Sequence, residues 1–360
     1  MLVCFPEYID IRGFFVLLRT QLYHIYMLSQ MLFSFAAPQM WLQIVLFVVG
    51  IGIVLWGADR LTDGAVGIAE RMGVPQIVIG LTIVAMGTSM PEFFVSFMSA
   101  VNGTPDLAVG NVVGSNIFNS LLIVGCAAAV SPIVILHNTV KKDIPFGLVA
   151  SAVLLIMCLD SGISRVDALL MLLMFVFFMY NTVKIAREDN TGENMPSDSS
   201  EPKAEETKKP VGIGKAILLT LVGLACLILG SNVFVDNVSA IARSLGMSDA
   251  LIGLTIVACG TSLPELATSV VAARRGNSGI AIGNVLGSNV FNILAILGLT
   301  GLISPMQLQG ITNVDLSVMV IAVVLLWLFS YTKYLIARWE GGVLILTFVG
   351  YLTYLITQTA

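Results

Sequence analysis

The chain has 360 residues, of which 57% are hydrophobic and only 11% are charged. Soluble domains carry about 25% charged residues, so the composition excludes an ordinary soluble protein and predicts an all-α integral membrane protein. A net charge of −4 gives no indication of nucleic acid binding, and the five cysteines and two histidines are too scattered to suggest a disulfide framework or a His/Cys metal site.

Residues 1–40 precede the long apolar stretches and have no counterpart in the second half of the chain. Glu7 and Asp10 lie beside Arg12 ahead of the apolar part, which is a poor match to a signal peptide. An interfacial amphipathic helix with aromatic anchors is a second interpretation. We expect an extension outside the membrane core, with Met40 as a candidate for the true first residue.

Apolar stretches long enough to cross a bilayer follow from residue 41 onward. A membrane helix needs roughly 20 mostly apolar residues. With that requirement the sequence predicts ten transmembrane helices, five on each side of a polar segment. They cover approximately residues 41–66, 75–100, 107–130, 144–160, 166–186, 213–241, 248–272, 280–303, 314–332 and 342–357.

Residues 188–212 are polar and cannot bury enough apolar surface to order themselves. We predict a flexible linker between a first repeat, 41–187, and a second repeat, 213–357. Thirteen of the eighteen Lys and Arg residues fall on the linker side of the membrane and four on the other. This bias predicts a cytoplasmic linker with both termini outside. Because five is an odd number, the second repeat enters from the opposite side, and the repeats are inverted.

The two halves share a nearly identical motif. GLTIVAMGTSMPE at 80–92 recurs as GLTIVACGTSLPE at 253–265, 173 residues later, with eleven of thirteen positions identical. Each copy places one carboxylate, Glu92 or Glu265, in an apolar stretch, where an ionised group is expensive and indicates function. The proline before each glutamate has no N–H, so it leaves a helical carbonyl without its partner.

Hydroxyl groups stand in the same broken turn of both copies, on Thr88, Ser89, Thr261 and Ser262. Carbonyl, hydroxyl and carboxylate oxygens are the ligands that hard cations such as Ca²⁺ bind. The duplication therefore predicts a cation site at the interface of the repeats. The alternative is a pair of proline kinks whose glutamates face a lumen without binding an ion.

A second motif keeps the same offset of 173. AVGNVVGSNIFN at 108–119 recurs as AIGNVLGSNVFN at 281–292, with nine of twelve positions identical. Gly110 and Gly114 form a smooth face that another helix can approach.

Polar side chains follow one helical face of this second motif. Asn111, Ser115 and Asn119 are four residues apart and therefore stack, whereas Asn116 falls outside the stripe. Ser115 and Asn119 offer neutral oxygens to a cation. Hydrogen bonding between helices is an equally good interpretation of Asn111 and Asn116. The counterparts in the second half are Asn284, Ser288, Asn292 and Asn289.

The duplicated motifs GTSxPE and GNxxGSNxFN together resemble those of the sodium/calcium exchanger family of cation antiporters, over about residues 41–357. The resemblance is to short prokaryotic members with ten membrane helices. It implies a secondary active antiporter that exchanges Na⁺ for Ca²⁺ by alternating access, at one central site between the repeats. Ca²⁺ and Na⁺ are then transported ions, and no cofactor is expected.

The resemblance also implies a set of metal-binding residues in each half. In the family they are carboxylates that bind both ions, backbone oxygens of a threonine and of the residue three before it, serines for Na⁺, and a second central pair. Carried over, these are Glu92, Glu265, Thr88, Thr261, Ala85, Ala258, Ser89, Ser262, Ser115, Ser288, Asn119 and Asn292. The potassium-dependent branch has an acidic residue in the last pair, so two asparagines argue against obligatory K⁺ coupling.

Other functions remain open. An H⁺/Ca²⁺ exchanger, or one for another divalent cation, is possible in the same fold because burial favours the neutral form of a carboxyl group. The four serines favour Na⁺, since a proton needs no such coordination. A passive cation channel is a further alternative, although inverted repeats favour a carrier. With no Ser/His/Asp set and no Walker loop, we expect neither an enzyme nor an ATP-driven pump.

We expect a multi-pass protein of the plasma membrane, the inner membrane in a bacterium. Its surroundings are the lipid bilayer, and neither nucleic acid nor an obligate protein partner is implied. Asp63 and Asp236 stand at equivalent positions near span ends, as hydrated carboxylates or along an ion access path.

Overall fold

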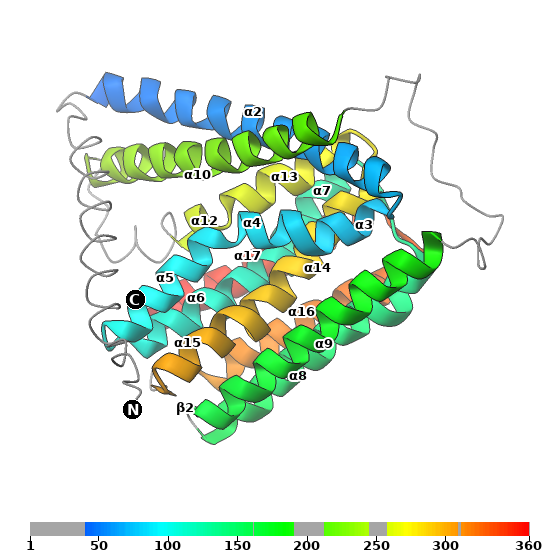
Figure 1. The fold of residues 1–360 in the computed structure, drawn as a ribbon. Helices are drawn as coiled ribbons and strands as arrows, with labels where there is room; N and C mark the ends of the chain where they lie inside the picture. The colour runs from blue at the N-terminus through cyan, green and yellow to red at the C-terminus, as the bar shows by residue number, and fades with distance from the viewer. Residues whose placement is uncertain (1–39, 161, 191–211, 245–257, 309–310, 360) are drawn as a thin grey trace, which may run out of the picture.

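The computed structural model describes residues 40–160, 162–190, 212–244, 258–308 and 311–359, and over these the fold is mostly helical, as predicted (Figure 1). The predicted N-terminal extension, apart from Met40, and most of the predicted linker lie outside the described residues. The α-helices are α2 (Met40–Met72), α3 (Gln76–Ile79), α4 (Ala85–Thr88), α5 (Met90–Val101), α6 (Pro105–Ile117), α7 (Val124–Val130), α8 (Ile144–Met157), α9 (Arg165–Asn190), α10 (Ile213–Ser244), α12 (Ala258–Thr261), α13 (Leu263–Arg274), α14 (Ser278–Val290), α15 (Leu297–Ile303), α16 (Asn313–Tyr331) and α17 (Arg338–Thr359).

Short elements of other kinds join these helices. A 3₁₀ turn, η4 (Cys158–Asp160), follows α8, and the wider π-helical turns are η1 (Gly80–Val84), η2 (Phe118–Ile123), η3 (Thr139–Asp143) and η6 (Phe291–Ile296). Two antiparallel strand pairs connect the halves: β1 (Ile133–Val134) with β4 (Leu335–Ile336), and β2 (Gly162–Ile163) with β3 (Met306–Gln307).

Seven helical segments among the described residues are long and apolar enough to cross a membrane, or eight if one bent pair is counted. The bent pair corresponds to the predicted span 75–100 and turns by 49° between Gln76–Thr88 and Met90–Val101. The predicted span 144–160 contains α8, which has only 14 residues. The predicted span 248–272 begins outside the described residues. Helix α9 runs on to Asn190, into the segment predicted as linker.

Helices α2 and α10 lie side by side along one side of the bundle, at the top of Figure 1. Glycines allow this close packing. A Cβ atom added at Gly57 would lie 2.9 Å from the Cβ of Cys226, and one added at Gly223 would lie 2.5 Å from the backbone nitrogen of Leu61. Small residues let helices pack backbone to backbone in a membrane, where packing rather than hydrophobicity drives association.

Helix α14 lies at the centre of the bundle, and every residue from Ile280 to Val290 is buried. Gly283 and Gly287, the counterparts of Gly110 and Gly114, provide a smooth face: an added Cβ at Gly287 would lie 2.6 Å from the Cβ of Ala85. Peripheral helices instead expose large apolar side chains, such as Val176 on α9 and Leu346 on α17. Apolar exposure outside and polar groups inside are expected of a protein whose surroundings are lipid.

Candidate functional site

Both duplicated glutamates follow a break in a helix. Helix α4 ends at Thr88, Ser89 leaves helical geometry with φ −83° and ψ 10°, and α5 then begins with Pro91 in its first turn. Ser262 breaks the second copy in the same way, with φ −90° and ψ 9° between α12 and α13. The broken helices predicted from the proline are confirmed. Each break places a serine hydroxyl and a glutamate in one turn.

The two breaks face each other across the repeats. Ser89 Oγ donates to Glu265 Oε1 at 2.9 Å, and Ser262 Oγ donates to Glu92 Oε1 at 2.9 Å. Both carboxylates are 1% exposed, and both serines are fully buried. Each half therefore supplies the hydroxyl that holds the other half's carboxylate, and residues 173 positions apart in the sequence form one interlocked cluster.

Four oxygen atoms of this cluster are buried without a hydrogen-bond partner among the described residues. They are the second oxygen of each glutamate and one amide oxygen from each motif, namely Glu92 Oε2, Glu265 Oε2, Asn119 Oδ1 and Asn292 Oδ1. All four are acceptors, and leaving such groups unpaired in a protein interior costs about 1–3 kcal/mol each. A bound cation would satisfy acceptors and cannot satisfy donors, so this pattern fits a cation.

The other residues of the predicted ligand set lie in the two helix breaks or in the second motif, and some of them contact this cluster. Ser262 Oγ is 3.2 Å from Ser115 Oγ, and Ser288 Oγ donates to the carbonyl of Ala85 at 3.5 Å. Thr88 is fully buried. Thr261 lies within hydrogen-bonding reach of Glu92. Ala258 begins α12.

Two further asparagines hold the glutamate backbones in place. Asn111 Nδ2 donates to the carbonyl oxygen of Glu92 at 3.2 Å, and Asn284 Nδ2 donates to that of Glu265 at 3.3 Å. The same amides also donate to Ser96 and Ser269 at 2.9 and 3.0 Å. The predicted ligand set omits these residues, and the interpretation that they form hydrogen bonds between helices is confirmed.

Asn116 was set apart from the polar stripe, yet its side chain lies in the same cluster. Its Oδ1 accepts from Asn292 Nδ2 at 3.2 Å, and its Nδ2 donates to the backbone carbonyl of Asn289 at 3.2 Å. The spacing argument considered only the first repeat, whereas the partners of Asn116 come from the second.

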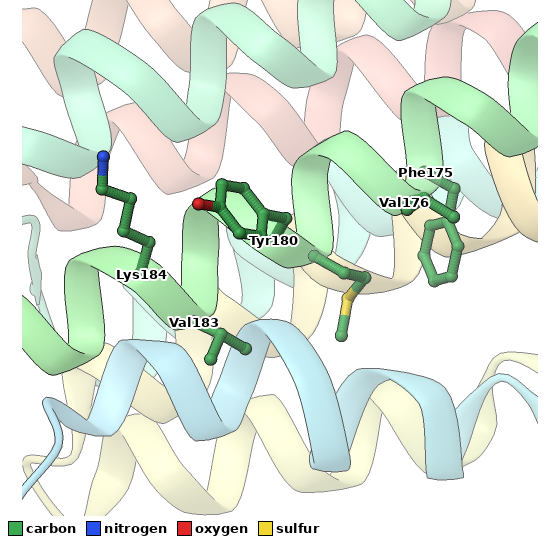
Figure 2. A pocket seen from close by; sticks show the side chains of 6 residues that line it. Phe175, Val176, Tyr180, Val183 and Lys184 are labelled. Atoms are coloured by element: carbon green, nitrogen blue, oxygen red, sulfur yellow. The ribbon is translucent and has the colours of Figure 1, made fainter.

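A separate groove of about 600 Å³ runs along α9 (Figure 2). It is lined by Phe175, Val176, Met179, Tyr180, Val183 and Lys184. Its walls are mostly apolar and its charged group is a cation, so this groove lacks the oxygen ligands that a hard metal ion needs.

The sequence profile described as "Sodium/calcium exchanger protein" matches residues 42–184 and again residues 215–357. The second match begins and ends 173 residues after the first, which is the offset of the duplicated motifs. The chain belongs to the sodium/calcium exchanger family.

Curated relatives align with 80–86% of this chain. The putative antiporter CaxA of Alkalimonas amylolytica is 39% identical, over 84% of this chain and 95% of its own length. The sodium/calcium exchanger MaX1 of Methanosarcina acetivorans is 33% identical, over 86% and 97%. The inner membrane protein YrbG of Escherichia coli is 35% identical, over 80% and 88%.

A solved structure of the sodium-calcium exchanger NCX_Mj, soaked with zero Na⁺ and Ca²⁺, superimposes with a TM-score of 0.75 at 30% identity. The match covers 88% of this chain and 100% of NCX_Mj. The exchanger family is one of multi-span membrane transporters, so this chain is a transporter rather than an enzyme.

Proposed function

We propose that this protein is a secondary active antiporter that exchanges Na⁺ for Ca²⁺ by alternating access at one central site. The observation that carries the proposal is the interlocked pair of glutamates, each with a free buried oxygen, together with two free buried amide oxygens from the second motif. The ligand set we propose is the one that the resemblance to the exchanger family implies. The relative named as the sodium/calcium exchanger MaX1 supports the same cargo, and the relative named as the putative antiporter CaxA supports antiport.

The proposed architecture has ten transmembrane helices in two inverted repeats, 41–187 and 213–357. The double match of the family profile at one fixed offset supports this division. A linker at 188–212 would lie in the cytoplasm, with both termini outside, according to the distribution of Lys and Arg. The membrane would be the plasma membrane, and residues 1–40 would lie outside the transport core.

The charge of the site explains how two binding reactions become an exchange. One Ca²⁺ neutralises two carboxylates, and two Na⁺ ions carry the same charge. Because both ions use the same oxygens, binding of one excludes the other.

No group of three or more His, Cys, Asp or Glu side chains gathers in the described part of the chain. Calcium affinity rises with the number of charged ligands, so a site with only two should release its ion.

Calcium uptake by proteoliposomes tests the proposed function. Vesicles containing the purified protein are loaded with Na⁺, K⁺ or choline at one pH, and entry of ⁴⁵Ca²⁺ is followed. We expect uptake that requires internal Na⁺ and collapses when Na⁺ is also present outside. Uptake that ignores Na⁺ and follows an imposed pH gradient would replace the proposal with proton exchange. Uptake driven by the Ca²⁺ gradient alone would indicate a channel.

A further inference from the structure

Two asparagines outside the proposed ligand set lie where the two repeats meet. Asn116 on α6 and Asn289 on α14 are 1% and 3% exposed. Each hydrogen bonds with the other half of the chain through both its amide nitrogen and its amide oxygen. An asparagine amide has an accepting end and a donating end, so such contacts decide which end of a neighbouring amide faces where.

The hydrogen bonds of Asn116 fix the orientation of the Asn292 side-chain amide. Asn116 Nδ2 donates to the backbone carbonyl of Asn289, and a carbonyl can only accept. Asn116 must therefore turn its Oδ1 to the opposite side, where it accepts from Asn292 Nδ2 at 3.2 Å. With its nitrogen held there, Asn292 presents its Oδ1 away from Asn116. That oxygen is one of the four buried acceptors without a partner among the described residues.

A second set of hydrogen bonds has the roles of the repeats exchanged: here Asn289 of the second repeat contacts Ser120 and Asn119 of the first. Asn289 Nδ2 donates to Ser120 Oγ at 2.8 Å, and Asn289 Oδ1 accepts from Asn119 Nδ2 at 3.1 Å. Asn119 Oδ1 is left free and buried. Asn119 lies one helical turn beyond Ser115, whose hydroxyl meets the Ser262 that holds Glu92, so the free oxygen belongs to the same cluster.

We propose that Asn116 and Asn289 are positioning residues, each of which turns the amide oxygen of its partner asparagine toward the transported cation. The partners are Asn292 and Asn119 respectively. A reversed amide would direct its N–H groups at the cation and repel it. Each repeat thus orients a ligand that belongs to the other repeat. The inference rests on the proposed function, and groups behind metal ligands often act in this way.

A double-mutant cycle separates orientation from general packing. Asn116→Leu removes the oxygen that holds Asn292, whereas Asn292→Asp replaces the ligand amide by a carboxylate with an oxygen at either position. We expect Asn116→Leu to raise the KM for Ca²⁺ uptake on the order of 10-fold in the wild-type background, with kcat changed much less. In the Asn292→Asp background, we expect the same substitution to change KM by less than about twofold, because no amide remains to be oriented.

An equal loss in both backgrounds, or a loss confined to kcat, would overturn the inference and leave the proposed function standing. Absence of saturable Ca²⁺ uptake in the wild-type protein would instead refute the proposed function itself. The same cycle is repeated with Asn289→Leu in the wild-type and Asn119→Asp backgrounds. If Asn116→Leu fails to fold, the KM values of this second cycle test the inference. Asn237→Leu is the matched control. It removes a buried amide whose hydrogen bond within the described part of the chain is to Val233 O on its own helix, and KM should stay within about twofold in both backgrounds.

Discussion

At the scale of single residues, the site is built from two acids and neutral oxygens. In each carboxylate, one oxygen accepts a hydrogen bond from a serine of the other repeat and the second oxygen has no partner among the described residues. Burying an ionised carboxylate is costly unless it is paired, and a single serine does not neutralise it. No ion pair with a Lys or Arg of the described residues balances either carboxylate, so a transported cation would supply the balancing charge.

Replacing either glutamate by glutamine tests this reading. Glu92→Gln and Glu265→Gln keep the size of the side chain and remove one negative charge. We expect each variant to fold and to lose Ca²⁺ uptake by at least about 100-fold, as expected when a direct charged ligand is lost.

Glu340→Gln provides the matched control for these two variants. Glu340 is also buried, at 4% exposure, but it accepts from the backbone of Ala337 at the start of α17. We expect its substitution to lower thermal stability while uptake stays near the wild-type rate. Full activity in either Glu92→Gln or Glu265→Gln would remove that residue from the site.

At the scale of helices, the small residues decide how closely segments approach. Gly57 and Gly223 stand where α2 and α10 touch, and Gly283 and Gly287 stand where α14 meets the first broken helix. The latter contact matters for the site because α14 also carries Ser288, and η6 carries Asn292. Close backbone packing thus brings the proposed ligands of both repeats together.

A side chain at the α2–α10 contact should force these helices apart. Gly223→Ala places a Cβ against the backbone of Leu61, which cannot move aside like a side chain. We expect a loss of about 1–3 kcal/mol in stability, the usual cost of overpacking. Gly52→Ala on the exposed face of α2 is the comparison, and there we expect no loss. Thermal unfolding of both variants in one detergent measures the difference. Equal stability would show that the two helices are not tightly packed.

At the scale of the whole molecule, α2 is tied to the rest of the bundle by ion pairs on one side. Arg275, after α13, contacts Asp59 Oδ1 through Nη2 and Asp63 Oδ1 through Nη1, both at 2.6 Å. The position equivalent to Arg275 in the first half is Asn102, and that equivalent to Asp59 is Asn232. This pair of contacts therefore has no chemical counterpart at the symmetry-related positions. Asp63 is thus an ion-pair partner rather than a bare hydrated carboxylate.

Loss of the Arg275 contacts should have a small, salt-dependent effect on stability. The three side chains are about one-third exposed, and such pairs contribute about 0.2–1 kcal/mol each. We expect Arg275→Gln to lower the Tm at 50 mM choline chloride, and the difference to shrink near 1 M, where the screening length falls to about 3 Å. Choline avoids occupancy of the site by Na⁺. Arg274→Gln is the comparison, and an undiminished difference at high salt would contradict an electrostatic origin.

Much of this organisation could be predicted from the sequence, because each motif residue in the first half identifies its equivalent in the second half. The broken helices, the buried glutamates and the serine and asparagine positions follow from motifs repeated at one offset. The pairing of Ser89 with Glu265, and of Ser262 with Glu92, could not be read from either copy alone. For Asn116, hydrogen bonding between helices was one of two interpretations and is observed, but its partners could not be read because a helical-face argument sees only neighbours on one helix. The position of the first break follows from Pro91, but the size of its bend, 49°, and the π-helical turns depend on packing between segments.

The central claim is that Ca²⁺ and Na⁺ share one site built by both repeats, and competition binding tests it most directly. Calcium binding to the purified protein would be measured by titration calorimetry at several fixed Na⁺ concentrations, with choline maintaining the ionic strength. We predict that Na⁺ raises the apparent Kd for Ca²⁺ without changing the number of sites, and that Glu92→Gln and Glu265→Gln each abolish binding. Calcium binding that is unaffected by Na⁺, or that survives in both variants, would contradict the shared site.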